Sequence, residues 1–301
     1  MAFISSCLAL AARFLGACLV FATLLAGLVG CGGGGVASGL GPLEESTAVA
    51  PPGLTGFFSS TDAQLHYQLD LPSGPGPFPA VVFGHGSGQV TKADGAIHLP
   101  FWLGQGFAVL RFDKRGSGQS SGSYRGVSAA NSAQQIPELA ADMVAGMAFL
   151  KVRPDIDAAR IGLTGVSQAG WVMLAATSLS PDVRFVVALV GSAVRVGVNI
   201  AWEELRLEPI EQAYAALGQY AGPTGWDPLP ALQASRAPVL YLLGADDRLV
   251  PTRVCTPLLE RLREQGLRVT ARVYPGLGHA LGSSSVAWPD IAGWLQAQGL
   301  R

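Results

Sequence analysis

The chain has 301 residues, 49% of them hydrophobic, and a formal net charge of −1. This length allows one large domain or two small ones, with enough apolar residues for a sizeable core. The near-zero charge argues against a nucleic-acid partner, because phosphate binding requires a clustered excess of Lys and Arg.

Residues 1–30 form an apolar leader, with the single charge of Arg13 ahead of an unbroken apolar run over 14–30. A positive flank, a short apolar stretch and small residues at its end are typical of a secretory signal peptide. The run is marginal for a membrane-spanning helix, which needs about 20 apolar residues. We therefore expect export, with an uncleaved anchor helix as the alternative.

The leader ends in Leu28-Val29-Gly30-Cys31, which resembles the lipobox of bacterial lipoproteins. The resemblance implies that Cys31 is lipidated and that the leader is cut before it. Gly32, the next residue, permits sorting to the outer membrane. We therefore expect an exported protein that is anchored to a bacterial membrane by a lipid on Cys31, at the outer membrane or periplasmic face if the cell is Gram-negative.

Residues 31–52 are rich in Gly, Ala, Ser and Pro without periodicity, which is typical of a flexible tether. The folded domain is expected to cover residues 53–301. Three of the four cysteines lie at or before the end of the leader, so Cys255 would be alone in this domain. We therefore expect a buried Cys255, no structural disulfide, no metal site and no cofactor.

After residue 52 the pattern becomes that of an α/β domain. Segments 54–58 and 64–69 alternate around a polar turn, which predicts an antiparallel hairpin. Short apolar strands then alternate with helices. The strands are expected at 80–83, 108–112, 161–166, 184–190, 239–243 and 268–273, and the helices at 138–150, 168–179, 252–265 and 291–298. This order predicts a mostly parallel sheet flanked by helices, with its site at the carboxyl ends of the strands.

The alternation is interrupted over residues 191–238, which contain no clear strand. A short helical cap inserted around residues 192–236 fits this gap. Its aromatic side chains would suit an apolar acyl group, and packing of the cap on itself is an equal alternative. These aromatic residues are Trp202, Tyr214, Tyr220 and Trp226.

A candidate nucleophile follows the strand 161–166. Ser167 stands between this strand and the next helix, and such a turn strains the backbone so that the hydroxyl is exposed. The turn requires small residues two positions before and two after the serine. Gly165 and Ala169 meet this requirement, although glycine is the usual residue where Ala169 stands.

A serine hydroxyl needs a base, and the base needs an acid to orient it. His279 lies in a glycine-rich loop after the strand 268–273, at the expected end of the sheet. Asp247 follows the strand 239–243, which gives the chain order serine, acid, histidine. The frame G-x-x-D-x-x-V-P selects Asp247, whereas the adjacent Asp246 is expected to stabilise the turn.

Acyl transfer also needs N–H donors for the developing oxyanion. One candidate is the backbone N–H of Gln168, at the start of a helix. The other is the N–H of Ser87, with Gly86 as the next choice, in a glycine-rich loop where His85 is expected to be structural. The loop over residues 113–120 is expected to be a rigid turn that supports the site.

Five segments together resemble the α/β-hydrolase superfamily, and they occur in order between residues 54 and 301. They are His85-Gly86-Ser87-Gly88, Asp113-x-Arg115-Gly116-x-Gly118-x-Ser120, Gly165-x-Ser167-x-Ala169-Gly170, Gly244-x-x-Asp247-x-x-Val250-Pro251 and Gly278-His279. The branch is similar to bacterial esterases and to serine-aminopeptidase and dienelactone-hydrolase-like groups. The resemblance implies an α/β-hydrolase fold with Ser167, Asp247 and His279 as a catalytic triad. It does not fix the substrate, because this fold hosts many chemistries.

Two interpretations from other classes compete with this one. Segment 83–88 after a strand resembles a dinucleotide-binding loop, but Gln89 and Thr91 stand where the fingerprint needs glycine. A non-catalytic lipoprotein with the same fold would leave the intact triad unexplained. Both alternatives are therefore weaker than a hydrolase.

Within the hydrolases, the favoured function is hydrolysis of a small-molecule carboxylic ester with a small or medium apolar acyl group. A serine aminopeptidase-like activity on peptides is the alternative, and it needs an acid for the substrate amine. Three cap carboxylates are candidates for that acid, and a solvated helix face is the simpler explanation of them. These residues are Glu203, Glu204 and Glu208.

Overall fold

A computed structural model of the chain describes residues 53–300. The expected signal peptide, the tether and the lipidation site at Cys31 lie outside these residues. Within the described part, no helix combines the length and the apolar character needed to cross a membrane.

One eight-stranded sheet forms the centre of this domain, in the order β1-β2-β4-β3-β5-β6-β7-β8. The hairpin β1–β2 pairs antiparallel with β4, and all the other pairings are parallel. The mostly parallel α/β sheet predicted from the sequence is thus confirmed. The strands are β1 (Leu54–Ser60), β2 (Ala63–Asp70), β3 (Phe78–Gly84), β4 (Ala108–Phe112), β5 (Ile156–Val166), β6 (Val186–Leu189), β7 (Val239–Gly244) and β8 (Val269–Tyr274).

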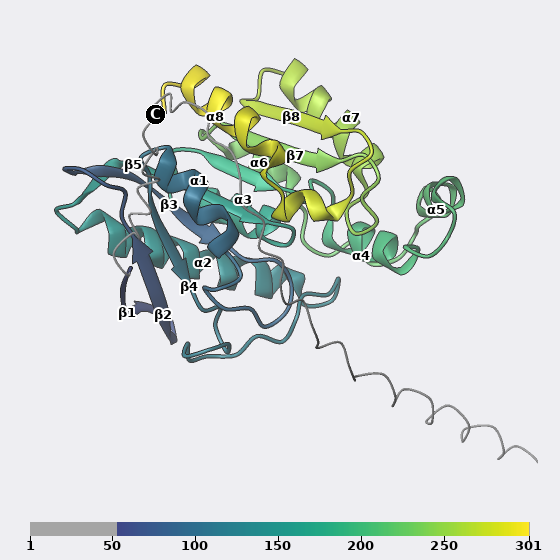
Figure 1. Cartoon of the computed structure of the whole chain (residues 1–301). Coiled ribbons are helices and arrows are strands. Elements are labelled where there is room, and N and C mark those ends of the chain that lie inside the picture. Colours follow the sequence, from purple (N-terminus) through teal and green to yellow (C-terminus); the bar gives the residue numbers. More distant parts are fainter. Residues whose placement is uncertain (1–52, 301) are drawn as a thin grey trace, which may run out of the picture. The chain divides into compact units, whose positions relative to one another are not determined.

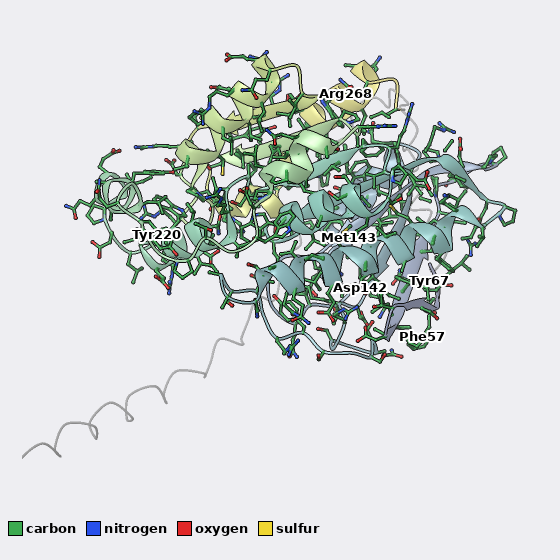
Figure 2. All side chains as sticks on the ribbon, turned by 180° about the vertical axis from the view of Figure 1, so that it is seen from behind. Phe57, Tyr67, Asp142, Met143, Tyr220 and Arg268 are labelled. Atoms are coloured by element: carbon green, nitrogen blue, oxygen red, sulfur yellow. The ribbon has the colours of Figure 1, made fainter. Side chains whose placement is uncertain are left out.

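Helices cover both faces of the sheet (Figure 1). In β3, Val82 packs into the same core cluster as Met143, whereas its neighbour Val81 packs with Trp102 and Trp294 on the opposite face. Figure 2 shows the face that carries Met143. Because both faces are buried, these strands have continuous apolar sequences instead of alternating ones. Outside the region of the expected cap, the α-helices are α1 (Leu99–Gly104), α2 (Ser132–Lys151), α3 (Ala169–Leu179), α7 (Thr252–Glu264) and α8 (Trp288–Ala297).

Two element boundaries differ from the sequence-based expectation by five residues or more. Helix α2 begins at Ser132 and continues through Pro137, which was expected to precede the helix. Proline costs a helix one backbone hydrogen bond, and packing of the buried face of α2 on the sheet compensates for that loss. Strand β5 begins at Ile156, because its polar first half still pairs with β3.

Three helices occupy the position of the expected cap between β6 and β7. They are α4 (Val196–Glu204), α5 (Ile210–Leu217) and α6 (Leu229–Ala234). Figure 1 shows α4 and α5 projecting past the sheet, and Tyr220 lies at this end in Figure 2. Trp202 is fully buried, and the centre of its ring lies 4.2 Å from that of Tyr214. These two aromatic side chains therefore pack within the insert.

Candidate active site

The predicted nucleophile stands in a strained turn. Ser167 joins β5 to α3 with φ of +55°, a left-handed backbone that side chains other than glycine seldom adopt. Its backbone N–H donates to the carbonyl of Leu189 at the end of β6, with an N–O distance of 2.9 Å. Strain of this kind persists only where the surroundings enforce it, and it concentrates at functional sites.

Small residues make room for this turn. A Cβ atom on Gly165 would lie 2.5 Å from the carbonyl oxygen of Gly84 and 2.7 Å from the Cβ of Ala169. A Cβ atom on Gly84 would lie 2.9 Å from the same methyl group. Ala169 is therefore accommodated because both residues that face it are glycines.

The predicted acid and base lie in contact. The His279 Nδ1 is 2.8 Å from the Asp247 Oδ2. The other carboxylate oxygen of Asp247 accepts the backbone N–H groups of Leu249 and Val250 at 2.7 and 2.9 Å. Asp247 is completely buried, whereas Asp246 is exposed. The structure thus brings His279 to Asp247 and leaves Asp246 in the turn.

The short helix η2 (His279–Ser283) brings the histidine close to the nucleophile turn. A Cβ atom on Gly282 would lie 3.7 Å from a methyl group of Val166, the residue before Ser167, and 2.7 Å from one of Val190. Within residues 53–300, no hydrogen bond joins the Ser167 hydroxyl to His279. Catalytic hydrogen bonds are often long without substrate and shorten when it binds.

The predicted oxyanion donors border Ser167. A Cβ atom on Gly86 would lie 3.6 Å from the Cβ of Ser167, so the loop over residues 84–88 packs against the nucleophile. In the described part of the chain, neither the N–H of Ser87 nor that of Gln168 donates to another protein group. Both N–H groups are therefore available to a ligand.

His85 has a structural role in this loop. Its Nε2 donates to the carbonyl of Phe112, and the side chain is 6% exposed. Burial lowers the pKa of His85 to about 4, so the ring is neutral near pH 7. A neutral, buried imidazole that holds two strand ends together agrees with the structural role expected from the sequence.

The loop over residues 113–120 is fixed by hydrogen bonds of the two residues that flank Lys114. The Asp113 carboxylate accepts the backbone N–H groups of Lys92 and Gln119 at 2.9 and 3.0 Å. The Arg115 guanidinium forms a two-pronged pair with Asp142 of α2, with both N–O distances 2.8 Å. These contacts make the loop a rigid turn beside the site.

Of the three cap carboxylates, only Glu203 is withdrawn from solvent, since Glu204 and Glu208 are exposed. Asn199 donates its Nδ2 to Glu203 at 2.7 Å and also to the carbonyl of Leu249 at 3.0 Å. Burial raises the pKa of Glu203, against the opposing influence of the nearby His279. The insert thus places one carboxylate near the acid–base pair. Within residues 53–300, no group of three His, Cys, Asp or Glu side chains is arranged to hold a metal ion.

A model of the prolyl oligopeptidase family matches residues 96–296, which is more than half of the chain. The chain belongs to this family. Ser167, Asp247 and His279 lie inside the prolyl oligopeptidase match, and the loop with Ser87 precedes it.

Individual relatives support the same fold. Carboxylesterase SOBER1 of Arabidopsis thaliana is 30% identical over 87 residues, which are 27% of this chain and 37% of that protein. The chain spans about a third of the length of the curated relatives it matches. An esterase of Pyrococcus furiosus superposes with a TM-score of 0.63 at 18% identity, over 82% of this chain and 91% of its own.

An acylaminoacyl peptidase of Pyrococcus horikoshii is also similar, with a TM-score of 0.58 at 17% identity, over 82% of this chain and 41% of that one. At such identities, similarity establishes the fold alone. The structural neighbours thus include an esterase and a peptidase on one α/β-hydrolase fold. The choice between an ester and a peptide bond rests on the residues of the site.

Proposed function

We propose that the chain is a serine hydrolase that cleaves carboxylic esters with a small or medium apolar acyl group. The observation that carries this proposal is the contact of the buried Asp247 with His279, at the same end of the parallel strands as the strained Ser167. A buried carboxylate orients the imidazole and stabilises its charged form. The carboxylesterase relative and the esterase neighbour favour an ester as substrate.

The reaction follows from this geometry. The N–H at Nδ1 of His279 donates to Asp247, which leaves Nε2 as the acceptor for the Ser167 proton. The Ser167 oxygen attacks the ester carbon, and the N–H groups of Ser87 and Gln168 stabilise the oxyanion. The alcohol leaves with the proton from Nε2. A water molecule then releases the acid by the same steps.

Removal of the nucleophile tests this function. Ser167→Ala should lower p-nitrophenyl ester hydrolysis by about 10⁴- to 10⁶-fold and abolish labelling by a fluorophosphonate probe. Ser178 is an exposed serine near the C-terminal end of α3, the helix that follows Ser167. Ser178→Ala is therefore the matched control and should behave as wild type. Undiminished labelling of Ser167→Ala would assign the nucleophile to another residue.

A peptidase that removes residues from a free N-terminus is the second candidate, and Glu203 is the observation that favours it. A half-buried carboxylate near His279 suits the ammonium group of such a substrate. Wild type and Glu203→Gln should be compared on p-nitrophenyl esters of several lengths and on aminoacyl anilides. An ester hydrolase should prefer the esters and retain this activity in Glu203→Gln. Faster cleavage of anilides, lost in Glu203→Gln, would favour the peptidase.

We further propose that the enzyme is exported and anchored to a bacterial membrane through a lipid on Cys31. The lipobox-like sequence Leu28-Val29-Gly30-Cys31 supports this proposal. One acyl chain binds a membrane only marginally, at about 0.8 kcal/mol per buried CH₂, so at least two chains are expected.

Strand β1 runs in the same direction as β4, because both are antiparallel to β2. The described domain therefore begins at the end of the strands opposite to the end that carries the candidate site.

Substitution of the lipidated residue tests the anchor. Cys31→Ser should remain active but keep its leader, so that it runs larger on a gel and carries no lipid. Cys18→Ser, within the same leader, is the control and should mature normally. If Cys31→Ser matures to the wild-type size and stays equally bound to membranes, an ordinary signal peptide or an anchor helix replaces the lipobox.

A further inference from the structure

Lys114 is a buried charged side chain to which the proposed mechanism gives no role. Lys114 is 4% exposed, and its ammonium group donates to three neutral oxygens. These are the carbonyls of Gly86 and Gly88, the latter at 3.0 Å, and the Oε1 of Gln168 at 3.2 Å. All three donors of the ammonium group are therefore used, and its acceptors lie on both sides of the proposed oxyanion site.

The bond to Gly86 fixes the direction of a catalytic donor. The carbonyl of Gly86 and the N–H of Ser87 belong to one peptide unit, and in a trans peptide they point in opposite directions. Holding this carbonyl on Lys114 therefore turns the Ser87 N–H away from the lysine. Gly86 itself packs against Ser167.

We propose that Lys114 is a positioning residue that locks the two halves of the oxyanion hole, the loop over residues 84–88 and Gln168, in one orientation. This inference rests on the proposed function. Glycines at 84, 86 and 88 give the loop a backbone that can rotate freely, and Gly88 has φ of +91°. A rotation of the Gly86–Ser87 peptide would remove one donor from the site, and the lysine opposes that rotation.

Neighbouring groups complete the network. The ammonium lies 4.3 Å from the ring centre of Tyr124, an arrangement that favours a cation. The Tyr124 hydroxyl accepts the N–H of Gly88 at 3.3 Å and lies 3.1 Å from the Gln168 Nε2, which donates to it. Burial lowers the pKa of Lys114 to about 7, against the attraction of Asp94, and His85 on the same loop is neutral. The three oxygen acceptors favour the charged lysine.

A purely structural role explains Lys114 less well. The flanking residues Asp113 and Arg115 already fix their loop through contacts that do not involve this ammonium. The ammonium group of Lys114 donates hydrogen bonds only to the oxyanion loop and to Gln168. Its loss should therefore affect the orientation of donors more than the folding of the domain.

The test compares Lys114→Met, which keeps the side-chain length, with Lys151→Met, which removes an ammonium from an exposed pair with Asp182. Since an oxyanion forms only in the transition state, Lys114→Met should lower kcat by about 10²-fold, with KM changed less than about threefold. Tyr124→Phe keeps the ring and removes the hydroxyl, so kcat should fall by about fivefold. Lys151→Met should match wild type in both constants.

Amide hydrogen exchange of residues 84–88 gives a readout that does not depend on activity. Exchange there should be faster in Lys114→Met than in wild type and Lys151→Met, while the rest of the domain is unchanged. Unchanged kcat in both Lys114→Met and Tyr124→Phe, or unchanged exchange in Lys114→Met, would overturn the proposal. If Lys114→Met fails to fold, an unchanged kcat in Tyr124→Phe overturns it and a fivefold fall supports it. If wild type neither hydrolyses esters nor is labelled at Ser167, the proposed function is wrong. Faster exchange of residues 84–88 in Lys114→Met would then still show that the lysine positions this loop.

Discussion

The nucleophile side and the acid–base side of the candidate site are held in place by different forces. Ser167 is fixed sterically, in a strained turn between residues that have no space for a larger side chain. Asp247 and His279 are fixed by hydrogen bonds, of which two come from backbone N–H groups. Close packing therefore constrains residue size on one side of the site, whereas hydrogen bonding constrains residue chemistry on the other.

Among substitutions that leave the nucleophile in place, the largest effect is expected from changing the chemistry of the hydrogen-bonded side. Asp247→Asn keeps the size of the side chain, but its amide can turn an N–H towards His279 and so favour the wrong tautomer. We expect kcat to fall by about 10⁴-fold, as is typical for the acid of such a triad. Asp246→Asn, at the exposed neighbour, should stay within about threefold of wild type. Matched kinetic assays that rank the two variants in reverse would assign the acid to Asp246.

A smaller effect is expected from changing size on the packed side. Gly165→Ala places a methyl group 2.5 Å from the Gly84 carbonyl oxygen. Such overpacking should lower the free energy of unfolding by about 1–3 kcal/mol, and it should lower kcat by displacing Ser167. Ala169→Gly is the control, because it only removes a methyl group and should cost about 1 kcal/mol. Urea unfolding of Gly165→Ala that coincides with wild type would show that the turn is not sterically fixed.

The smallest effect at neutral pH is expected from His85, which changes the stability only when the pH is lowered. Burial lowers the pKa of His85 to about 4, whereas the ordinary value is 6.5. The unfolded chain therefore binds more protons between these values, so the free energy of unfolding should fall as the pH falls from 6.5 to 4. One proton gives a slope of at most about 1.4 kcal/mol per pH unit.

His85→Gln isolates this contribution, because glutamine keeps an N–H donor for the carbonyl of Phe112 but does not titrate. Its stability should depend less on pH over this range. His98 should still contribute in both proteins, since burial lowers the pKa of that residue to about 4 as well. Parallel pH slopes for wild type and His85→Gln in urea unfolding would contradict the prediction.

Features that depend on local spacing could be predicted from the sequence. Each buried strand produces an apolar run, and the small residues around Ser167 indicate a tight turn. Chain order and the frame around the acid predict Asp247 as the partner of His279. The structure places these two residues in contact and adds that Asp247 is buried and Asp246 exposed.

Other features could not be predicted, because they depend on contacts between distant residues. Lys114 lies in a polar turn, where a lysine is normally solvated, and its burial depends on Gln168, 54 positions away. The sequence of the insert does not show whether its aromatic residues line a pocket or pack together. In the structure, Trp202 and Tyr214 form part of the insert's own core. A proline normally ends a helix, so the sequence does not indicate that α2 begins before Pro137.

The packing around Ala169 has a consequence for how this sequence can vary. Gly84 and Ala169 face each other across a space that holds one methyl group, and the other neighbour of a Cβ on Gly84 is the flexible end of Met143. Either residue, but not both, can therefore be an alanine. Gly84→Ala should be harmful alone but tolerated together with Ala169→Gly, as a positive coupling in a double-mutant cycle. Gly165 is not exchangeable in this way, because its nearest neighbour is a backbone oxygen that no substitution can remove.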